Sequence, residues 1–249
     1  MKPFLAAIQF LTVFPFPKSF VGGEKELEKS VPYFPVVGLL IGIIIAAFDH
    51  LICFILPFLP ASVITVIALT SISGGLHMDG LADTADGFFS ARPRERVLEI
   101  MRDSRTGVMG VVAVVFVIIL KISLLMTLSA PLRFGIILLM PLAGRCSLVM
   151  MMRTLSYVRH EGGLATVFGK GRSWLNVLWS SVFLFAVGWI AEHGLGLAAS
   201  TLSLLAAALF LVYCFRKIGG YTGDTLGAVC EITEIIPALA AVTMSRIFT

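Results

Sequence analysis

The sequence has little charge. Of its 249 residues only 14% are Asp, Glu, Lys or Arg, whereas 58% are hydrophobic and the mean hydropathy is +0.97. Soluble domains are about 25% charged, so a water-soluble globule of this length would lack the polar surface to cover itself. The shortage of charge excludes that class of protein. Lipid is the alternative solvent for much of the surface.

Cysteine is also scarce, and the chain lacks a cleavable leader pattern. The four cysteines are Cys53, Cys146, Cys214 and Cys230. They are far apart and form no Cys-x-x-Cys pair, so they support neither a zinc site nor a redox motif. The apolar N-terminal segment has no small-x-small cleavage pattern and is interrupted by Pro15 and Pro17. We therefore predict a short interfacial helix there in place of a signal peptide.

What the sequence does contain is a series of long apolar runs. A helix needs about 20 apolar residues to cross a bilayer core. The runs that approach this length are 35–56, 61–76, 107–128, 132–152, 174–192, 196–215 and 227–248. They predict an all-α, polytopic integral membrane protein with about seven transmembrane helices (about six to eight). Residues 1–249 are expected to form a single membrane-embedded domain.

Basic residues are unevenly distributed among the predicted connections. Fifteen of the 19 Lys and Arg residues fall on one side, whereas the connections of the other side carry only Arg133. The positive-inside rule places the basic side in the cytoplasm. We therefore expect a multi-pass protein of the cell (inner or plasma) membrane, with the acid- and arginine-rich segment 77–106 facing the cytoplasm. This distribution also explains the net charge of +4 without a nucleic-acid partner.

Three aspartates gather in residues 74–89, GGLHMDGLADTADGFF. Asp79, Asp83 and Asp86 stand at i, i+4 and i+7, which places them on one face of a helix. Like charges at this spacing repel, and the neighbouring glycines lower helix stability. The segment is therefore expected to be a bent or broken helix whose carboxylates have a functional role.

A second acidic group lies in residues 219–234, GGYTGDTLGAVCEITE. Asp224, Glu231 and Glu234 fall on one helical face there. Carboxylate oxygens with little thiol or imidazole nearby suit Mg²⁺, which takes one or two carboxylates and shares its other positions with water and substrate phosphates. Arginines hold phosphate oxygens in bidentate fashion. The pattern indicates a Mg²⁺-dependent site for a pyrophosphate-linked substrate, and the alternative is a set of solvated charges at helix ends.

Several segments, in order along the chain, resemble the cobalamin synthase family, the adenosylcobinamide-GDP ribazoletransferases. They are FLAAIQFLTVFPFP, GGLHMDGLADTADGFFS with RERVLEIMRDSRTGVMG, GRCSLVMMMRTLSYVRHEGGLATVFG, and GGYTGDTLGAVCEITE. The resemblance implies a Mg²⁺-dependent membrane transferase of a late step of vitamin B12 biosynthesis. It would join adenosylcobinamide-GDP with α-ribazole, or its 5′-phosphate, to give adenosylcobalamin (or its 5′-phosphate) and GMP. Homo-oligomers and association with other cobalamin-assembly enzymes are hypotheses that the sequence leaves open.

Such a reaction gives the singled-out residues candidate roles. Asp79, Asp83 and Asp86 are the first-choice Mg²⁺ ligands, with Asp103 as a fourth ligand or as a partner of one. One of the three aspartates, or alternatively His77, is the candidate general base. The candidate substrate-binding residues are Arg102, Asp103, Arg105, Arg153, His160, Asp224 and Glu231.

Two other functions fit parts of the pattern. The segment DTADG matches the start of the CDP-alcohol phosphotransferase signature, D-x2-D-G-x2-A-R-x8-G-x3-D-x3-D. The Ala-Arg pair, however, comes one residue late, and the last part of the signature is absent. A cation transporter with intramembrane acids is the second alternative. Against it, the acids cluster at one face and the sequence has no internal repeats of the transporter kind.

Overall fold

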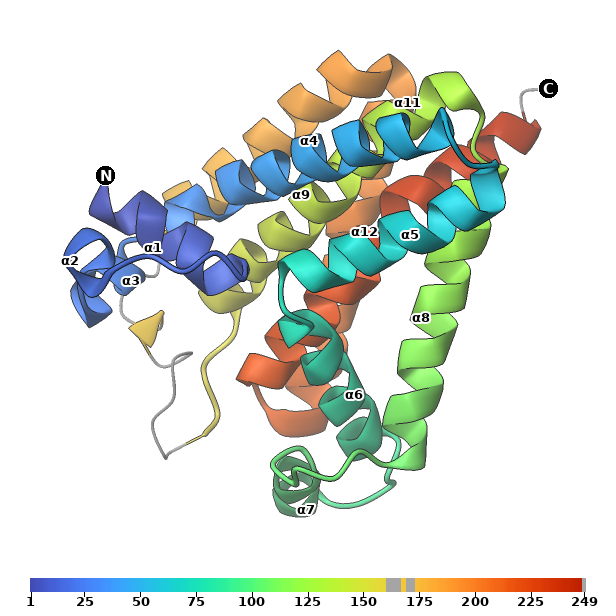
Figure 1. Cartoon of the computed structure of the whole chain (residues 1–249). Coiled ribbons are helices and arrows are strands. Elements are labelled where there is room, and N and C mark those ends of the chain that lie inside the picture. The colour runs from blue at the N-terminus through green and yellow to red at the C-terminus, as the bar shows by residue number, and fades with distance from the viewer. Residues whose placement is uncertain (160–166, 169–172, 248–249) are drawn as a thin grey trace.

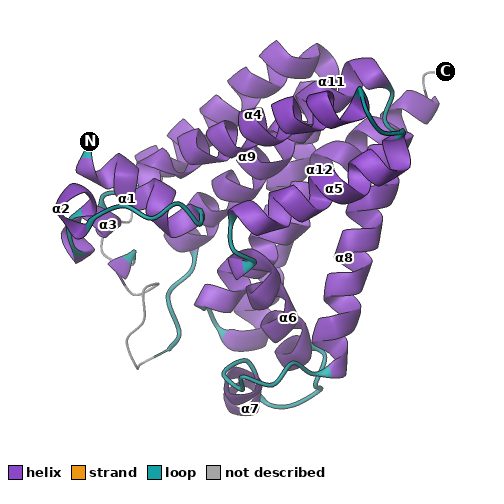
Figure 2. Ribbon diagram, in the orientation of Figure 1, coloured by secondary structure: helices purple, strands orange, loops and turns teal. Residues whose placement is uncertain are grey.

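A computed structural model of the chain describes residues 1–159, 167–168 and 173–247. The described chain is almost wholly helical (Figures 1 and 2). The helices are α1 (Lys2–Leu11), α2 (Lys18–Val21), α3 (Glu24–Glu28), the 3-10 turn η1 (Val31–Tyr33), α4 (Phe34–Cys53), α5 (Phe58–Ile72), α6 (Leu76–Phe88), α7 (Arg94–Ile100), α8 (Val108–Thr127), α9 (Ala130–Thr154), α11 (Trp174–Ile218) and α12 (Gly223–Ile247). The predicted all-α class is confirmed.

Most of the long helices can cross a membrane. Five segments have the required length and apolarity, namely η1 with α4, α8, α9, α11 and α12. The pair α5 and α6 meets the same criterion jointly but bends by 89° at its break, which makes it a sixth candidate. The predicted run 61–76 is thus half of a bent pair. The prediction of a multi-pass membrane protein is confirmed.

The length of α11 explains why these counts differ from the predicted seven. Its 45 residues would extend about 68 Å if straight, more than twice the roughly 30 Å bilayer core. The backbone leaves the helical region at His193, and the chain turns back. A Cβ atom on Gly188 would lie 2.7 Å from the carbonyl oxygen of Gly196, and the Ser200 hydroxyl donates to the Leu184 carbonyl at 3.3 Å. α11 therefore comprises two packed antiparallel halves, which correspond to two of the predicted runs.

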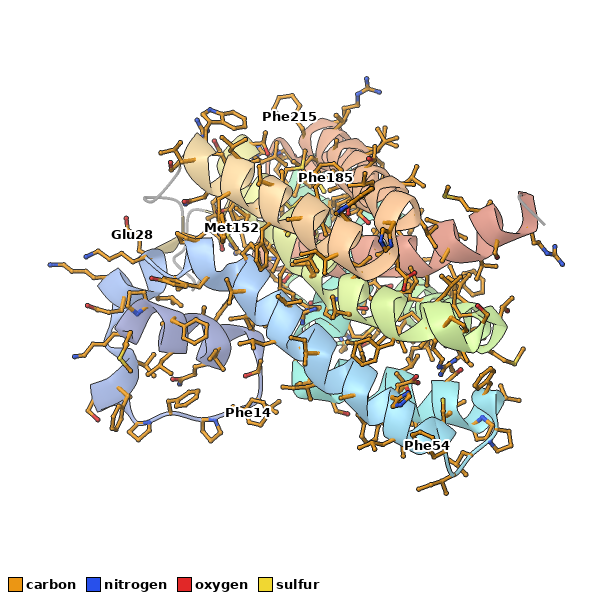
Figure 3. The ribbon with its side chains drawn as sticks, turned by 90° about the horizontal axis from the view of Figure 1, so that it is seen from above. Phe14, Glu28, Phe54, Met152, Phe185 and Phe215 are labelled. Atoms are coloured by element: carbon orange, nitrogen blue, oxygen red, sulfur yellow. The ribbon has the colours of Figure 1, made fainter. Side chains whose placement is uncertain are left out.

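Helix α9 lies at the centre of the bundle. α4, α11 and α12 pack around it (Figures 1 and 3), so most of its apolar side chains are buried, whereas those of α8 largely face outward. Small residues allow such close packing between membrane helices. At the α4–α9 crossing, a Cβ atom on Gly38 would lie 2.9 Å from the Cα atom of Leu142.

The N-terminal segment forms helix α1, as predicted. It is apolar and has 10 residues, which is too short to cross a bilayer core. α1 lies beside α2 and α3 at one end of the molecule (Figure 1), and it buries Ala6, Ala7 and Leu11. Its location at the membrane interface stays a prediction.

Two groups of charged side chains are buried among the membrane helices. In the first, Arg133 of α9 donates to both oxygens of Asp49 of α4, at 2.6 and 2.7 Å, and to the Ser62 hydroxyl of α5 at 3.1 Å. The Thr65 hydroxyl also donates to Asp49. A buried charge is costly unless it is paired, and here each charge has its counterpart. This pair fastens α4, α5 and α9 together.

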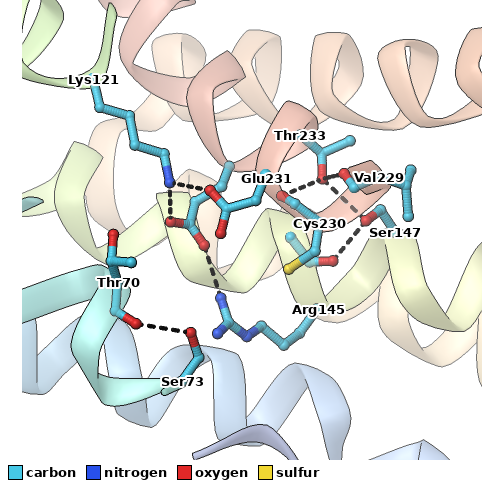
Figure 4. Close-up of polar contacts among 11 residues, drawn as sticks. Thr70, Ser73, Lys121, Arg145, Ser147, Val229, Cys230, Glu231 and Thr233 are labelled. Carbon is cyan, nitrogen blue, oxygen red and sulfur yellow. Dashed lines mark hydrogen bonds and ion pairs between the residues drawn. The ribbon is translucent and has the colours of Figure 1, made fainter. Parts of the chain in front are cut away.

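The second group joins α8, α9 and α12 (Figure 4). Lys121 donates to Glu231 and to Glu234, both at 2.7 Å. Arg145 donates to the other oxygen of Glu234 at 2.8 Å. All four side chains are at most 4% exposed. Two cations and two anions therefore form an electrically balanced cluster, which we call the core ion cluster.

Candidate active site

The site begins where α5 gives way to α6. Gly74 and Gly75 have φ of +62° and +74°, a left-handed backbone that glycine adopts without the strain a side chain would add. The two helices consequently meet at 89°. The bend separates the acidic segment from α5, so α6 sets the direction in which Asp79 and Asp83 project.

Glycines also bring α6 against α12. A Cβ atom on Gly80 would lie 2.7 Å from the carbonyl oxygen of Asp224, and one on Gly227 would lie 2.9 Å from that of His77. The two backbones therefore touch, as small residues permit at membrane-helix crossings. This crossing places the first acidic group beside Asp224, although more than 130 residues separate them.

A cavity of about 240 Å³ lies at this crossing, and we call it the site cavity. Its polar walls come from His77 and Asp79 of α6, Asp224 of α12, and Tyr157 and Arg159 after α9. The remaining lining residues are Phe10, Leu76, Gly80, Leu148, Met152, Gly223, Leu226 and Gly227. The cavity thus combines carboxylates, an arginine and apolar surface.

Asp83 is half-buried beside this cavity and is surrounded by like charge. It experiences repulsion from Asp224, Asp79 and Asp86, and attraction from Arg159. Such a carboxylate gains more than an isolated one from a nearby cation or proton. The acids of α6 and the acid of α12 therefore converge on one place, where a bound cation would relieve their repulsion.

Arg159 and Asp224 form an ion pair in the wall of the site cavity. The guanidinium donates to the Oδ2 atom of Asp224 at 2.5 Å and to the carbonyl of Met101 at 3.3 Å. The Thr222 hydroxyl donates to the same Asp224 oxygen at 3.3 Å. Arg159 is therefore placed to meet an anion that enters the cavity, with its charge close to the carboxylates of Asp224 and Asp83.

Asp86 faces a different neighbour. Its Oδ2 atom accepts from the backbone N–H of Gly107 at 2.6 Å, and its Oδ1 atom accepts from that of Gly110 at 2.8 Å. Gly107 is the residue that caps the start of α8, where unpaired N–H groups favour a negative charge. Both oxygens of Asp86 are thus engaged in holding α8 against α6. Its predicted role as a Mg²⁺ ligand stays a prediction.

We expect Asp86→Asn to lower the stability of the folded protein by about 1–2 kcal/mol, because an amide nitrogen cannot accept one of these two hydrogen bonds. Thermal unfolding in detergent measures the change. Asp83→Asn is the matched control, since it removes a carboxylate one turn away that has no such bonds. Equal stability of the two variants would contradict the capping role.

Other predicted site residues lie away from the cavity walls. Asp103 and Arg105 pair on the surface between α7 and α8, at 2.7 Å, and the guanidinium holds the pKa of the Asp103 carboxyl at about 2. Arg102 is exposed at the end of α7. The guanidinium carbon of Arg153 lies 4.1 Å from the ring centre of Trp174. The predicted contacts of these residues with a substrate stay predictions.

The two remaining predicted substrate residues are Glu231 and His160. Glu231 is buried and binds the Lys121 side chain of α8 in the core ion cluster. It does not line the site cavity. His160 lies outside the described residues.

His77, the alternative candidate for general base, is 3% exposed, and its Nδ1 atom has no hydrogen-bond partner within the described parts of the chain.

The carboxylates at the cavity are the candidate ligands for Mg²⁺. Within the described residues, no group of three or more His, Cys, Asp or Glu side chains is placed to hold a metal ion. Mg²⁺ needs only one or two protein carboxylates and takes its other ligands from water and phosphate. Asp83 and Asp224, together with Asp79, supply hard oxygens of the required kind. The donor set therefore fits a cation completed by a substrate.

Sequence reasoning found the acids but missed several partners. Tyr157 and Phe10 line the site cavity, and neither stands in a pattern that marks it as functional. Lys121 and Arg145 were visible as charges in apolar runs, which is a signal of function or pairing. Their partners, however, lie on α12, about 90 to 110 residues away in sequence.

Comparisons with known proteins relate the chain to one family. The family model described as cobalamin-5-phosphate synthase matches residues 3–242. Similar proteins named adenosylcobinamide-GDP ribazoletransferase include those of Geotalea daltonii (33% identical, covering 100% of both chains), Desulforamulus reducens (38%, covering 92% of this chain and 91% of the relative) and Clostridium novyi (37%, covering 96% of each). No solved structure matches the chain.

Proposed function

Because the chain belongs to the cobalamin-5-phosphate synthase family, we propose that it is an adenosylcobinamide-GDP ribazoletransferase, which performs the final joining step of cobalamin synthesis. The observation that carries this proposal is the site cavity, where α6 and α12 bring carboxylates beside Arg159. Such a cavity suits the diphosphate of adenosylcobinamide-GDP. The acceptor is α-ribazole or its 5′-phosphate.

The reaction exchanges one bond to phosphorus for another. A ribose hydroxyl oxygen of the acceptor bonds to the phosphorus attached to the cobinamide side, and the bond from that phosphorus to the bridging oxygen breaks. GMP leaves with the bridging oxygen, and the hydroxyl proton passes to a base on the protein. The chain must therefore bind a highly charged diphosphate, orient the hydroxyl and accept one proton.

We assign these tasks to residues that line the site cavity and to Asp83, which is close enough to Asp224 to be repelled by it. Asp83 and Asp224 would hold Mg²⁺, which neutralises charge on the diphosphate and on the departing phosphate when it is bound. Arg159 would bind phosphate oxygens, since a guanidinium matches their geometry. Asp79 and His77 line the cavity and are the two candidates for proton acceptor.

A substrate comparison tests the proposal against its closest alternative. Purified protein in detergent would be given adenosylcobinamide-GDP with α-ribazole, or a CDP-alcohol with a second alcohol, each with Mg²⁺. We expect GMP release in the first mixture and no CMP release in the second. CMP release in the second mixture, with no GMP in the first, would support a CDP-alcohol phosphotransferase. Ion flux through proteoliposomes without either release would support a transporter.

We also propose that the site opens to the cytoplasm. Several basic segments lie away from the α4–α5 connection, with α1 to α3 at the left and α7 at the bottom of Figure 1. Arg94 of α7 donates to the carbonyl of Ile218 at the end of α11. The positive-inside rule assigns these basic segments to the cytoplasm. The α4–α5 connection, which includes the 79% exposed Ile55, would then face outward.

Thiol labelling tests this orientation. In a chain whose native cysteines are replaced by alanine, Ser90→Cys is expected to react with a membrane-impermeant reagent only after the cells are opened. Ile55→Cys is expected to react in intact cells, because it lies at the opposite end. The reverse pattern would contradict the proposed orientation.

A further inference from the structure

A second hollow lies next to the site cavity. It has a volume of about 510 Å³ and is bounded by the α5–α6 break, the start of α6 and Val114 of α8. We call it the outer groove. Its volume falls within the range of about 300–1,000 Å³ that is common for small-molecule sites. Leu76 and Asp79 line both hollows, so these two residues form the wall between them.

The two hollows differ in chemistry. The site cavity contains the Arg159–Asp224 pair and the start of α12, which suit a charged diphosphate. Apart from Asp79, the outer groove is lined only by glycines and apolar side chains, and none of its described lining residues is basic. It therefore suits a flat, apolar and uncharged body, and it would bind a diphosphate poorly.

The reaction itself calls for two binding places. In phosphoryl transfer the attacking and leaving oxygens lie roughly in line on opposite sides of the phosphorus. Acceptor and donor must consequently approach one point from different directions. Asp79 is exposed and is the one charged residue among the described residues that line both hollows. A carboxylate in that position faces both hollows.

From this arrangement we propose that the outer groove is the acceptor site, which binds the aromatic base of α-ribazole against Leu76, Val114 and the glycines of the α5–α6 break. The ribose hydroxyl then lies toward the wall that Leu76 and Asp79 form between the two hollows. The donor diphosphate occupies the site cavity. The inference rests on the proposed function, and it adds where each substrate binds.

Two substitutions that fill one hollow each provide the test. Val114→Phe adds bulk to the outer groove, from a partly buried position on α8. Gly223→Val adds bulk to the site cavity, and a Cβ atom at Gly223 meets no other atom within 4 Å. Val115→Phe is the matched control, because Val115 is 43% exposed on the same helix and lines neither hollow.

We expect Val114→Phe to raise the KM for α-ribazole by about tenfold or more, which is the scale of a misfit in an apolar pocket. The KM for adenosylcobinamide-GDP should stay within about twofold of the wild-type value. Gly223→Val is expected to do the reverse, and Val115→Phe to change neither constant. Calorimetric binding of α-ribazole in the absence of donor should weaken in parallel for Val114→Phe. If that variant does not fold, the smaller change Val114→Leu serves in its place.

The outcomes separate this inference from the proposed function. An unchanged KM for α-ribazole in a folded groove variant that still turns over would overturn the acceptor site alone. A larger effect of the groove variant on the donor than on the acceptor would overturn it too. Wild-type protein that neither binds α-ribazole nor releases GMP would overturn the proposed function as well.

Discussion

Asp83→Asn is expected to lower turnover by at least about 100-fold, which corresponds to about 2.7 kcal/mol of lost transition-state stabilisation. The amide keeps the size of the side chain but removes the charge that a divalent cation or proton would meet. Asp83 is also repelled by Asp79, Asp86 and Asp224. The variant should therefore be at least as stable as the parent, because the substitution relieves this repulsion.

Turnover and thermal unfolding would be measured together in detergent. Glu95→Gln is the matched control, since Glu95 is an exposed acid on the neighbouring helix α7 and should leave turnover within about twofold. Full Mg²⁺-dependent activity of Asp83→Asn would refute the role of this carboxylate. A loss of activity that accompanies unfolding would instead assign Asp83 to stability.

Lys121→Met is expected to destabilise the protein by about 3–5 kcal/mol, the cost of leaving a buried charge without its partner. Lys121 holds Glu231 and Glu234 at 2.7 Å each, within side chains that are almost fully buried. Removing it leaves two carboxylates with one cation, Arg145. Thermal unfolding and the yield of folded protein in detergent measure the loss.

A second substitution distinguishes charge imbalance from lost packing. Lys121→Met combined with Glu231→Gln leaves one cation and one anion, Arg145 and Glu234, which remain bonded at 2.8 Å. We therefore expect the double variant to be more stable than Lys121→Met alone. A double variant that is less stable than the single one would show that the core ion cluster acts through packing.

The membrane helices could be predicted because hydropathy is a local property. Each predicted run corresponds to a helix or to part of one, and even the fold-back of α11 agrees with two separate runs. The bend at Gly74 and Gly75 was also foreseeable, since glycines inside an apolar helical pattern weaken it. Crossing partners are not local, and the Gly80–Gly227 contact joins positions that no periodicity relates.

The spacing of the acids in the sequence does not predict which helix each of them faces. Helical periodicity placed Asp79, Asp83 and Asp86 on one face, and Asp83 is repelled by both of the others. α6, however, packs between α12 and α8. Asp83 therefore lies near Asp224, whereas Asp86 reaches the start of α8. Only the packing of the neighbouring helices separates these two environments.

The most direct test of the central claim is the mass of the product. Purified protein in detergent would be incubated with adenosylcobinamide-GDP, α-ribazole and Mg²⁺, with Asp83→Asn run in parallel. The account predicts a product whose mass equals that of the two substrates less GMP, formed by the wild-type protein and nearly absent from the variant. Folded wild-type protein that yields no such product would contradict it.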